Sequence, residues 1–96
     1  WLQATVFSSH LRLHGIGERE PWAFGTDTEA IARQWLGFRY RLLPYLQRVI
    51  AEAVATGMPV MRAMALAFPG NALTRGYETQ FMCGDTLLVA PDKLTV

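Results

Sequence analysis

The stretch TDTEAIARQWLGFRYRLLPYLQRVIAEAVATG, residues 26–57, sets the architecture expected of this chain. Apolar side chains recur along it every three or four residues, the spacing that places them on one face of an α-helix. These apolar positions are Ile31, Trp35, Phe38, Leu42, Tyr45, Leu46, Val49 and Ala53. The pattern predicts a long amphipathic helix over residues 27–56.

This helix has a signal at each end and an interruption in its middle. Thr26 and Glu29 have the spacing of a capping box, in which each side chain satisfies a backbone N–H of the first turn. Gly57 followed by Pro59 is a stop signal. Pro44 lacks an amide donor and clashes with the preceding turn, so it either kinks the helix or separates two helices.

A short alternating segment precedes the helix. After a helical turn at the N-terminus, residues 10–14 (HLRLH) alternate polar and apolar side chains, a period of two that predicts a strand. Such a strand places His10, Arg12 and His14 on one face and its two leucines on the other. Residues 15–25 then form a loop that carries charged side chains beside aromatic ones.

Beyond the helix, apolar runs separated by turn residues indicate β structure. Residues 59–68 (PVMRAMALAF) have the composition of a buried strand, residues 79–82 of one helical turn, and residues 84–85 of a tight turn. Residues 86–90 (TLLVA) predict a further strand. The order of elements indicates an α/β unit that passes into a β-rich module.

The composition narrows the class of protein. The chain has 96 residues, a net charge of +1, 51% hydrophobic and 18% charged residues, and one cysteine. The hydrophobic content excludes a disordered chain, and the charge balance argues against a nucleic-acid binder. Cys83 alone cannot form an internal disulfide framework, and no apolar run of about 18 residues is present to span a membrane. So few charges on so small a chain indicate a segment of a larger protein.

Two histidines are candidates for ligand binding. On a strand, His10 and His14 would lie about 13 Å apart, too far to share a metal ion, and no third ligand accompanies them. His14 is followed by Gly15 at the end of the expected strand, which is the end where α/β barrels bind ligands. The alternative is that His14 is a hydrogen-bonded structural histidine.

Arg12 shares a face with these histidines, and a charge directed into a cleft there needs a carboxylate partner. Glu18 or Glu20 folding back is one source of that partner, and a carboxylate outside this chain is the other. Glu18 and Glu20 flank Arg19 in a loop, which favours solvated salt bridges over an acid/base pair.

Six motifs follow one another along the chain. They are residues 1–4 (WLQA), 7–15 (FSSHLRLHG), 19–25 (REPWAFG), 39–46 (RYRLLPYL), 57–62 (GMPVMR) with 68–69 (FP), and 80–91 (QFMCGDTLLVAP). In this order and spacing they resemble glycoside hydrolase family 31, the retaining α-glucosidases and α-xylosidases. The second motif, in its SSHLRLHG form, resembles the α-xylosidase branch.

The resemblance implies a fold that agrees with the order of elements. The family has a (β/α)8 TIM barrel followed by β-sandwich domains. Residues 1–57 would then be the C-terminal part of the barrel, with its last strand and last helix. Residues 58–96 would begin the proximal C-terminal β domain.

The resemblance also implies roles for individual residues. The family's two catalytic aspartates, a nucleophile and a general acid/base, fall outside this chain. His14 matches a histidine that hydrogen-bonds sugar hydroxyls in the −1 subsite, and Arg12 matches an arginine beside the catalytic carboxylates. Trp22 is expected to line the approach to the site. Three further acidic residues match no catalytic motif: Asp27, Asp85 and Asp92.

These features predict part of a retaining α-glycosidase that hydrolyses terminal, non-reducing α-linked xylose or glucose from oligosaccharides. The chain alone is expected to be inactive. No metal, organic cofactor, nucleic acid or membrane is implied. The whole enzyme is expected in the cytoplasm, and a homo-oligomer is compatible with the sequence. The alternative is a non-catalytic α/β interaction module that needs a partner to cover its apolar surface.

Overall fold

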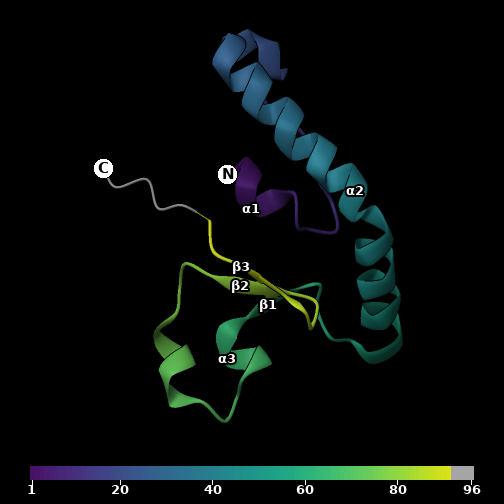
Figure 1. Ribbon diagram of the computed structural model, residues 1–96, viewed down its shortest axis with the longest axis vertical. Helices are drawn as coiled ribbons and strands as arrows, with labels where there is room; N and C mark the ends of the chain where they lie inside the picture. The colour runs from purple at the N-terminus through teal and green to yellow at the C-terminus, as the bar shows by residue number, and fades with distance from the viewer. Residues whose placement is uncertain (92–96) are drawn as a thin grey trace.

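A long helix runs along one side of the molecule, and the N-terminal segment and a small sheet lie beside it (Figure 1). The computed structural model describes residues 1–91. Residues 92–96, which include Asp92 and the end of the second expected domain, lie outside the described residues. The arrangement is an α/β unit joined to a small antiparallel sheet, which agrees with the expected order of elements.

The long helix, α2 (Thr26–Thr56), ends where the sequence predicts. Gly57 follows it with a φ of 80° and donates its amide to the Ala53 carbonyl at 2.8 Å. Glycine suits this left-handed conformation because it has no Cβ to clash with the preceding carbonyl. The stop signal is therefore confirmed.

The start of α2 differs from the expected capping box. Gly25 is the N-cap, no side chain caps the helix, and Thr26 is already its first residue. The Glu29 carboxylate instead forms an ion pair with Arg33, one turn later, with 3.3 Å between Oε1 and Nη2. Asp27 and Glu29 lie in the first turn, where the positive end of the helix dipole favours acidic side chains. The capping-box prediction is wrong because the helix begins one residue earlier.

Pro44 does not divide the helix. Residues 26–56 form a single α-helix with Pro44 inside it, so the alternative of two helices is wrong. The axis of α2 changes direction about midway along its length, as a proline in a helix interior predicts (Figure 1). Pro44 is exposed. The Tyr40 carbonyl, which has no amide donor at position 44, therefore lies on the outer side of the helix.

Three short strands form an antiparallel sheet in the order β1-β2-β3: β1 (Met61–Ala63), β2 (Phe81–Cys83) and β3 (Leu87–Val89). Cys83 in the central strand pairs with Met61 on one side and Leu87 on the other. The strand expected over residues 86–90 and the tight turn before it are confirmed.

Two expectations for this region are wrong. Residues 79–82 are not a helical turn, because Phe81 and Met82 belong to the central strand β2, held by pairing with distant residues. Residues 59–68 are not one strand. Only Met61–Ala63 pairs, and α3 (Met64–Ala67) follows, a Met-Ala-Leu-Ala run of strong helix formers.

The segment of residues 10–14 is irregular, so the strand predicted there is wrong for this structure. A strand is held by a ladder of hydrogen bonds to a neighbour, and among residues 1–91 the sheet contains only β1, β2 and β3. The preceding helical turn, α1 (Leu2–Thr5), is confirmed. The segment connects α1 to the 3-10 helix η1 (Pro21–Phe24), which leads into α2.

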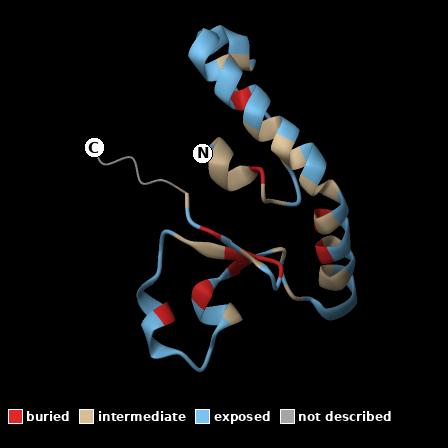
Figure 2. Ribbon diagram, in the orientation of Figure 1, coloured by how far each residue is buried: buried red, intermediate tan, exposed pale blue. Residues whose placement is uncertain are grey.

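The core lies where α2, the N-terminal segment and the sheet meet. Leu46 from α2, Cys83 from β2 and Val89 from β3 form a buried cluster, and Phe7 packs against it. Val6, just after α1, is completely buried. Much of the remaining surface of α2 is exposed or half-buried (Figure 2).

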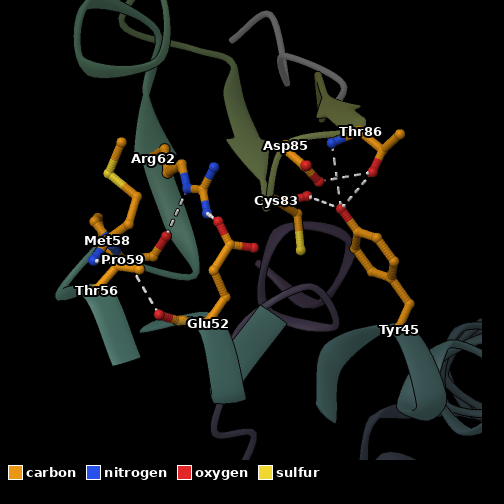
Figure 3. Close-up of polar contacts among 9 residues, drawn as sticks. All are labelled: Tyr45, Glu52, Thr56, Met58, Pro59, Arg62, Cys83, Asp85 and Thr86. Atoms are coloured by element: carbon orange, nitrogen blue, oxygen red, sulfur yellow. Dashed lines mark hydrogen bonds and ion pairs between the residues drawn. The ribbon is translucent and has the colours of Figure 1, made fainter. Parts of the chain in front are cut away.

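One tyrosine joins the helix to the β2–β3 hairpin (Figure 3). The Tyr45 hydroxyl donates to the Cys83 carbonyl at 2.6 Å, and the Thr86 amide donates to the same hydroxyl oxygen at 3.4 Å. Gly84, between them, has a φ of 66°, and a Cβ there would lie 2.7 Å from Val49 Cγ2 and collide with the Tyr45 hydroxyl. The hairpin turn therefore needs glycine for both its conformation and its space.

A buried arginine makes a second connection between the helix and the sheet (Figure 3). Arg62 in β1 is 5% exposed. Its Nε donates to the Pro59 carbonyl at 2.9 Å, and its Nη2 lies 3.3 Å from Glu52 Oε1 in the last turns of α2. The single charge in an otherwise apolar run is thus paired, as a buried charge must be.

Replacing Tyr45 with Phe removes the hydroxyl that holds the hairpin and leaves the Cys83 carbonyl without this donor. We expect Tyr45→Phe to lower the free energy of unfolding by about 1–2 kcal/mol. Tyr40→Phe is the matched control, because Tyr40 lies on the same helix with 74% of its surface exposed. Urea denaturation of the full-length gene product measures the difference, and equal midpoints for the two variants would contradict the role of Tyr45.

Candidate functional site

His14 lies at the meeting of two shallow surface pockets. One pocket, of about 250 Å³, is lined by His14 together with Arg12, Arg19 and Phe24. The other, of about 310 Å³, is lined by His14, Arg19, Glu20 and Trp22. All three residues singled out from the sequence, Arg12, His14 and Trp22, therefore border one continuous stretch of surface.

Trp22 reaches this surface from the 3-10 helix that precedes α2. Glu20 is extended, and Pro21 occupies the first position of η1, where its missing N–H costs nothing. The Ala23 amide donates to the Glu20 carbonyl at 3.0 Å and closes the turn around Trp22. The indole is 66% exposed, so a flat apolar face is available beside His14.

The alternation of residues 11–14 persists only in part, because the segment is not a strand. Leu11 and Leu13 line a pocket of about 300 Å³ together with Leu36, Arg39, Tyr40 and Leu43 of α2. Arg12 and His14 do not line that pocket and border the surface described above instead. Leu13, however, also lines both pockets that His14 lines, so the predicted separation of the leucines from Arg12 and His14 holds for Leu11 and is wrong for Leu13.

Arg12 has no carboxylate partner among residues 1–91. The two ion pairs of this part of the chain join Glu29 to Arg33 and Glu52 to Arg62. Neither Glu18 nor Glu20 folds back onto Arg12, so that source of a partner is wrong for the described structure. The salt bridges expected between these two glutamates and Arg19 are likewise not formed in it.

Arg19 is a site residue that the sequence analysis did not single out. Its side chain lies against Gly15, the residue after His14, and it lines both pockets. Gly17, with a φ of 82°, reverses the chain between them. The Gly15-Ile16-Gly17 run was the available signal, because two glycines two residues apart favour a tight reversal that returns Arg19 toward His14.

The remaining candidates do not form a site. Cys83 is completely buried, and its Sγ donates to the Phe7 carbonyl at 3.3 Å. Burial raises the pKa of this thiol, which disfavours the reactive thiolate form. Within residues 1–91, no three His, Cys, Asp or Glu side chains gather to hold a metal ion. No helix in the same range is long and apolar enough to cross a membrane.

Two family models match the chain on either side of the end of α2. Residues 1–49 match the TIM-barrel domain of glycosyl hydrolases family 31, and residues 57–92 match the C-terminal domain of the same family. A complete (β/α)8 barrel takes about 200–250 residues, so residues 1–49 correspond to part of one. The chain is thus built as the end of a glycoside hydrolase barrel joined to the start of the domain that follows it.

The chain belongs to glycoside hydrolase family 31. It is 37% identical over 94 residues to alpha-glucosidase 2 of Bacillus thermoamyloliquefaciens and 39% identical over 92 residues to an alpha-xylosidase of Emericella nidulans. Each alignment covers 95% of this chain and 12% of the relative. The family and the fold class expected from the six motifs are confirmed.

A solved structure agrees with these relatives. The family 31 dextranase of Flavobacterium johnsoniae, complexed with isomaltotriose, superposes with a TM-score of 0.88 at 40% identity. The superposition covers 100% of this chain and 12% of the dextranase. The arrangement of α2, the N-terminal segment and the hairpin is therefore one that also occurs within a complete family member.

The buried thiol generates a test of the packing below the site. The pKa of Cys83 is raised chiefly by burial, so at neutral pH the residue is a thiol rather than the reactive thiolate. We expect iodoacetamide at pH 7.5 to leave Cys83 of the native full-length gene product unmodified and to alkylate it after denaturation in urea. Mass spectrometry of the peptide that contains Cys83 measures this, and fast alkylation of the native protein would show that the core is open.

Proposed function

We propose that this chain supplies the sugar-binding end of the barrel to a retaining α-glycosidase that removes terminal α-linked xylose or glucose from the non-reducing end of oligosaccharides. The observation that carries the proposal is the position of His14, on a surface it shares with Arg12 and Trp22, in a chain of this family. Named relatives include alpha-glucosidases and an alpha-xylosidase, which supports an α-linked sugar substrate of this class.

His14 is proposed to hydrogen-bond sugar hydroxyls in the −1 subsite. Its imidazole is exposed and carries two nitrogens that can donate or accept. Hydrogen bonds to sugar hydroxyls can strengthen as the ring distorts toward an oxocarbenium-like transition state, so they lower the barrier rather than only tightening binding. Trp22, also exposed, is proposed to offer an apolar face to the incoming sugar at the edge of the same surface.

Arg12 is proposed to pair with the catalytic carboxylates, which other parts of the enzyme supply. Its guanidinium is exposed here and meets no carboxylate of residues 1–91. A guanidinium beside a carboxylate favours the ionised form, which is the form a nucleophile needs. Arg19, on the same pockets, adds a second positive charge to this end of the site.

These assignments place the two parts of the proposed enzyme's chain in different domains. Residues 1–57 would be the last part of the barrel, and residues 58–96 the start of the proximal C-terminal β domain. The chain itself would be inactive, because both catalytic aspartates of the expected mechanism lie outside it. A cytoplasmic location, a homo-oligomer and the lack of a cofactor remain predictions for the whole enzyme.

Exposed apolar side chains favour a second candidate function, an interaction module that needs a partner. Ile16, Val54 and Tyr40 are 93%, 84% and 74% exposed, far from one another along the chain. In the first proposal the rest of the enzyme covers such side chains. In the second, a separate protein covers them and no hydrolysis occurs.

Hydrolysis of p-nitrophenyl α-xyloside and α-glucoside separates the two candidates. We expect the full-length gene product to release p-nitrophenol from at least one substrate and residues 1–96 alone to release none. The preferred substrate then distinguishes xylose from glucose specificity. No release from either substrate by the full-length protein would favour the interaction module.

A substitution tests the role of His14 directly. We expect His14→Ala to lower kcat/KM of the full-length enzyme by about tenfold to a thousandfold, because transition-state hydrogen bonds are lost. His10→Ala is the matched control, since His10 is also exposed but lines neither pocket. An unchanged kcat/KM for His14→Ala would assign this histidine a structural role.

A further inference from the structure

Three consecutive carbonyl groups just before the His14 segment are held by side chains from elsewhere in the chain. Arg39 of α2 donates from Nη1 to the carbonyls of Val6 and Ser8, each at 2.8 Å. The thiol of Cys83 donates to the carbonyl between them, that of Phe7, at 3.3 Å. Irregular backbone is thus bound by side chains where a sheet ladder is not available among residues 1–91.

The three carbonyls of residues 6–8 form an anchor, and both side chains that hold it come from elements that contribute to the core. Arg39 is half-buried on α2, the element that passes through the core. Cys83 is buried in the central strand, and its own carbonyl receives the Tyr45 hydroxyl of the same helix. The Phe7 ring packs edge-on against Phe38, one residue before Arg39, with 5.6 Å between ring centroids.

The chain continues from the anchor to His14, the candidate sugar-binding residue. Ser8 Oγ is within hydrogen-bond distance of the His10 carbonyl, which fixes the chain as it leaves the anchor. Arg39 also lines the pocket that Leu11 and Leu13 line, so the apolar side of the segment faces the same arginine. Leu13 lines this pocket and also both pockets that His14 lines, so it connects the side of the segment nearest Arg39 to the His14 surface.

We propose that Arg39 is a positioning residue. By holding the Val6 and Ser8 carbonyls, it determines the position of His14 relative to the sugar. The inference rests on the proposed role of His14 in sugar binding. Arg39 donates to these two backbone carbonyls and lines neither pocket that His14 lines, so it acts only through the segment it holds. Both bonds come from Nη1, whose two hydrogens reach both carbonyls at once, which a donor with a single hydrogen could not do.

Arg39→Met in the full-length enzyme tests the proposal. Methionine keeps the apolar stem and removes the donors, so we expect kcat to fall about tenfold to a hundredfold, with KM changed by less than about threefold. Arg39→Lys should recover part of kcat, because an ammonium can donate to two carbonyls. Arg41→Met is the matched control, since Arg41 lies two residues away on the same helix and is exposed.

A double-mutant cycle with His14→Ala distinguishes positioning from a general loss of structure. If Arg39 acts through His14, Arg39→Met should lower kcat by less than about threefold in the His14→Ala background, because the effects of coupled residues are not additive. The same fold loss in both backgrounds would overturn the proposal while leaving the proposed function intact. If Arg39→Met does not fold, the cycle is run with Arg39→Lys and judged by the same criterion. If the enzyme without substitutions is inactive, or if His14→Ala alone has no effect on kcat/KM, the role of His14 is overturned and this inference with it.

Discussion

The contact between the Tyr45 hydroxyl and the Cys83 carbonyl is the point on which the rest of this structure depends. Tyr45 lies in the part that matches the barrel domain and Cys83 in the part that matches the following domain. The Cys83 thiol also donates a hydrogen bond to the Phe7 carbonyl, so one position in β2 contacts both the long helix and the N-terminal segment. Contacts from the long helix and from the N-terminal segment therefore meet at a single buried residue of the hairpin.

The sequence predicts the elements held by local forces and misses those held by distant ones. The helix over residues 26–56 has a regular apolar period and a glycine stop, so its pattern is sufficient. Strand β2 is short and exists only because Met61 and Leu87 pair with Cys83 from both sides, which no local pattern reveals. The strand expected over residues 10–14 failed for the complementary reason, since a barrel strand needs neighbours that residues 1–91 do not supply.

The candidate site follows the same division. Alternation alone places Leu11 away from Arg12 and His14, because it needs only an extended backbone, but it misplaces Leu13, which lines the pockets on both sides. Nothing in the spacing of Arg39 along the helix indicates which groups it contacts. Its actual partners are carbonyls more than thirty residues earlier, at 2.8 Å, and only the folded chain brings them together. The roles of individual residues came from the family resemblance, which the two matched domain models support at the level of the family.

The close approach of Tyr45 to Gly84 links two positions that are distant in the chain. A side chain at Gly84 would collide with the tyrosine hydroxyl, so that glycine cannot be replaced while Tyr45 remains. A smaller residue at Tyr45 would remove that collision but also the hydrogen bond to Cys83, and Val49 Cγ2 would still lie 2.7 Å from the new Cβ. Even then the φ of 66° favours residues that tolerate a left-handed backbone, such as asparagine. An evolutionary or engineered path that replaces Gly84 must therefore also change the residues packed against it, and it passes through an intermediate less stable than its starting point.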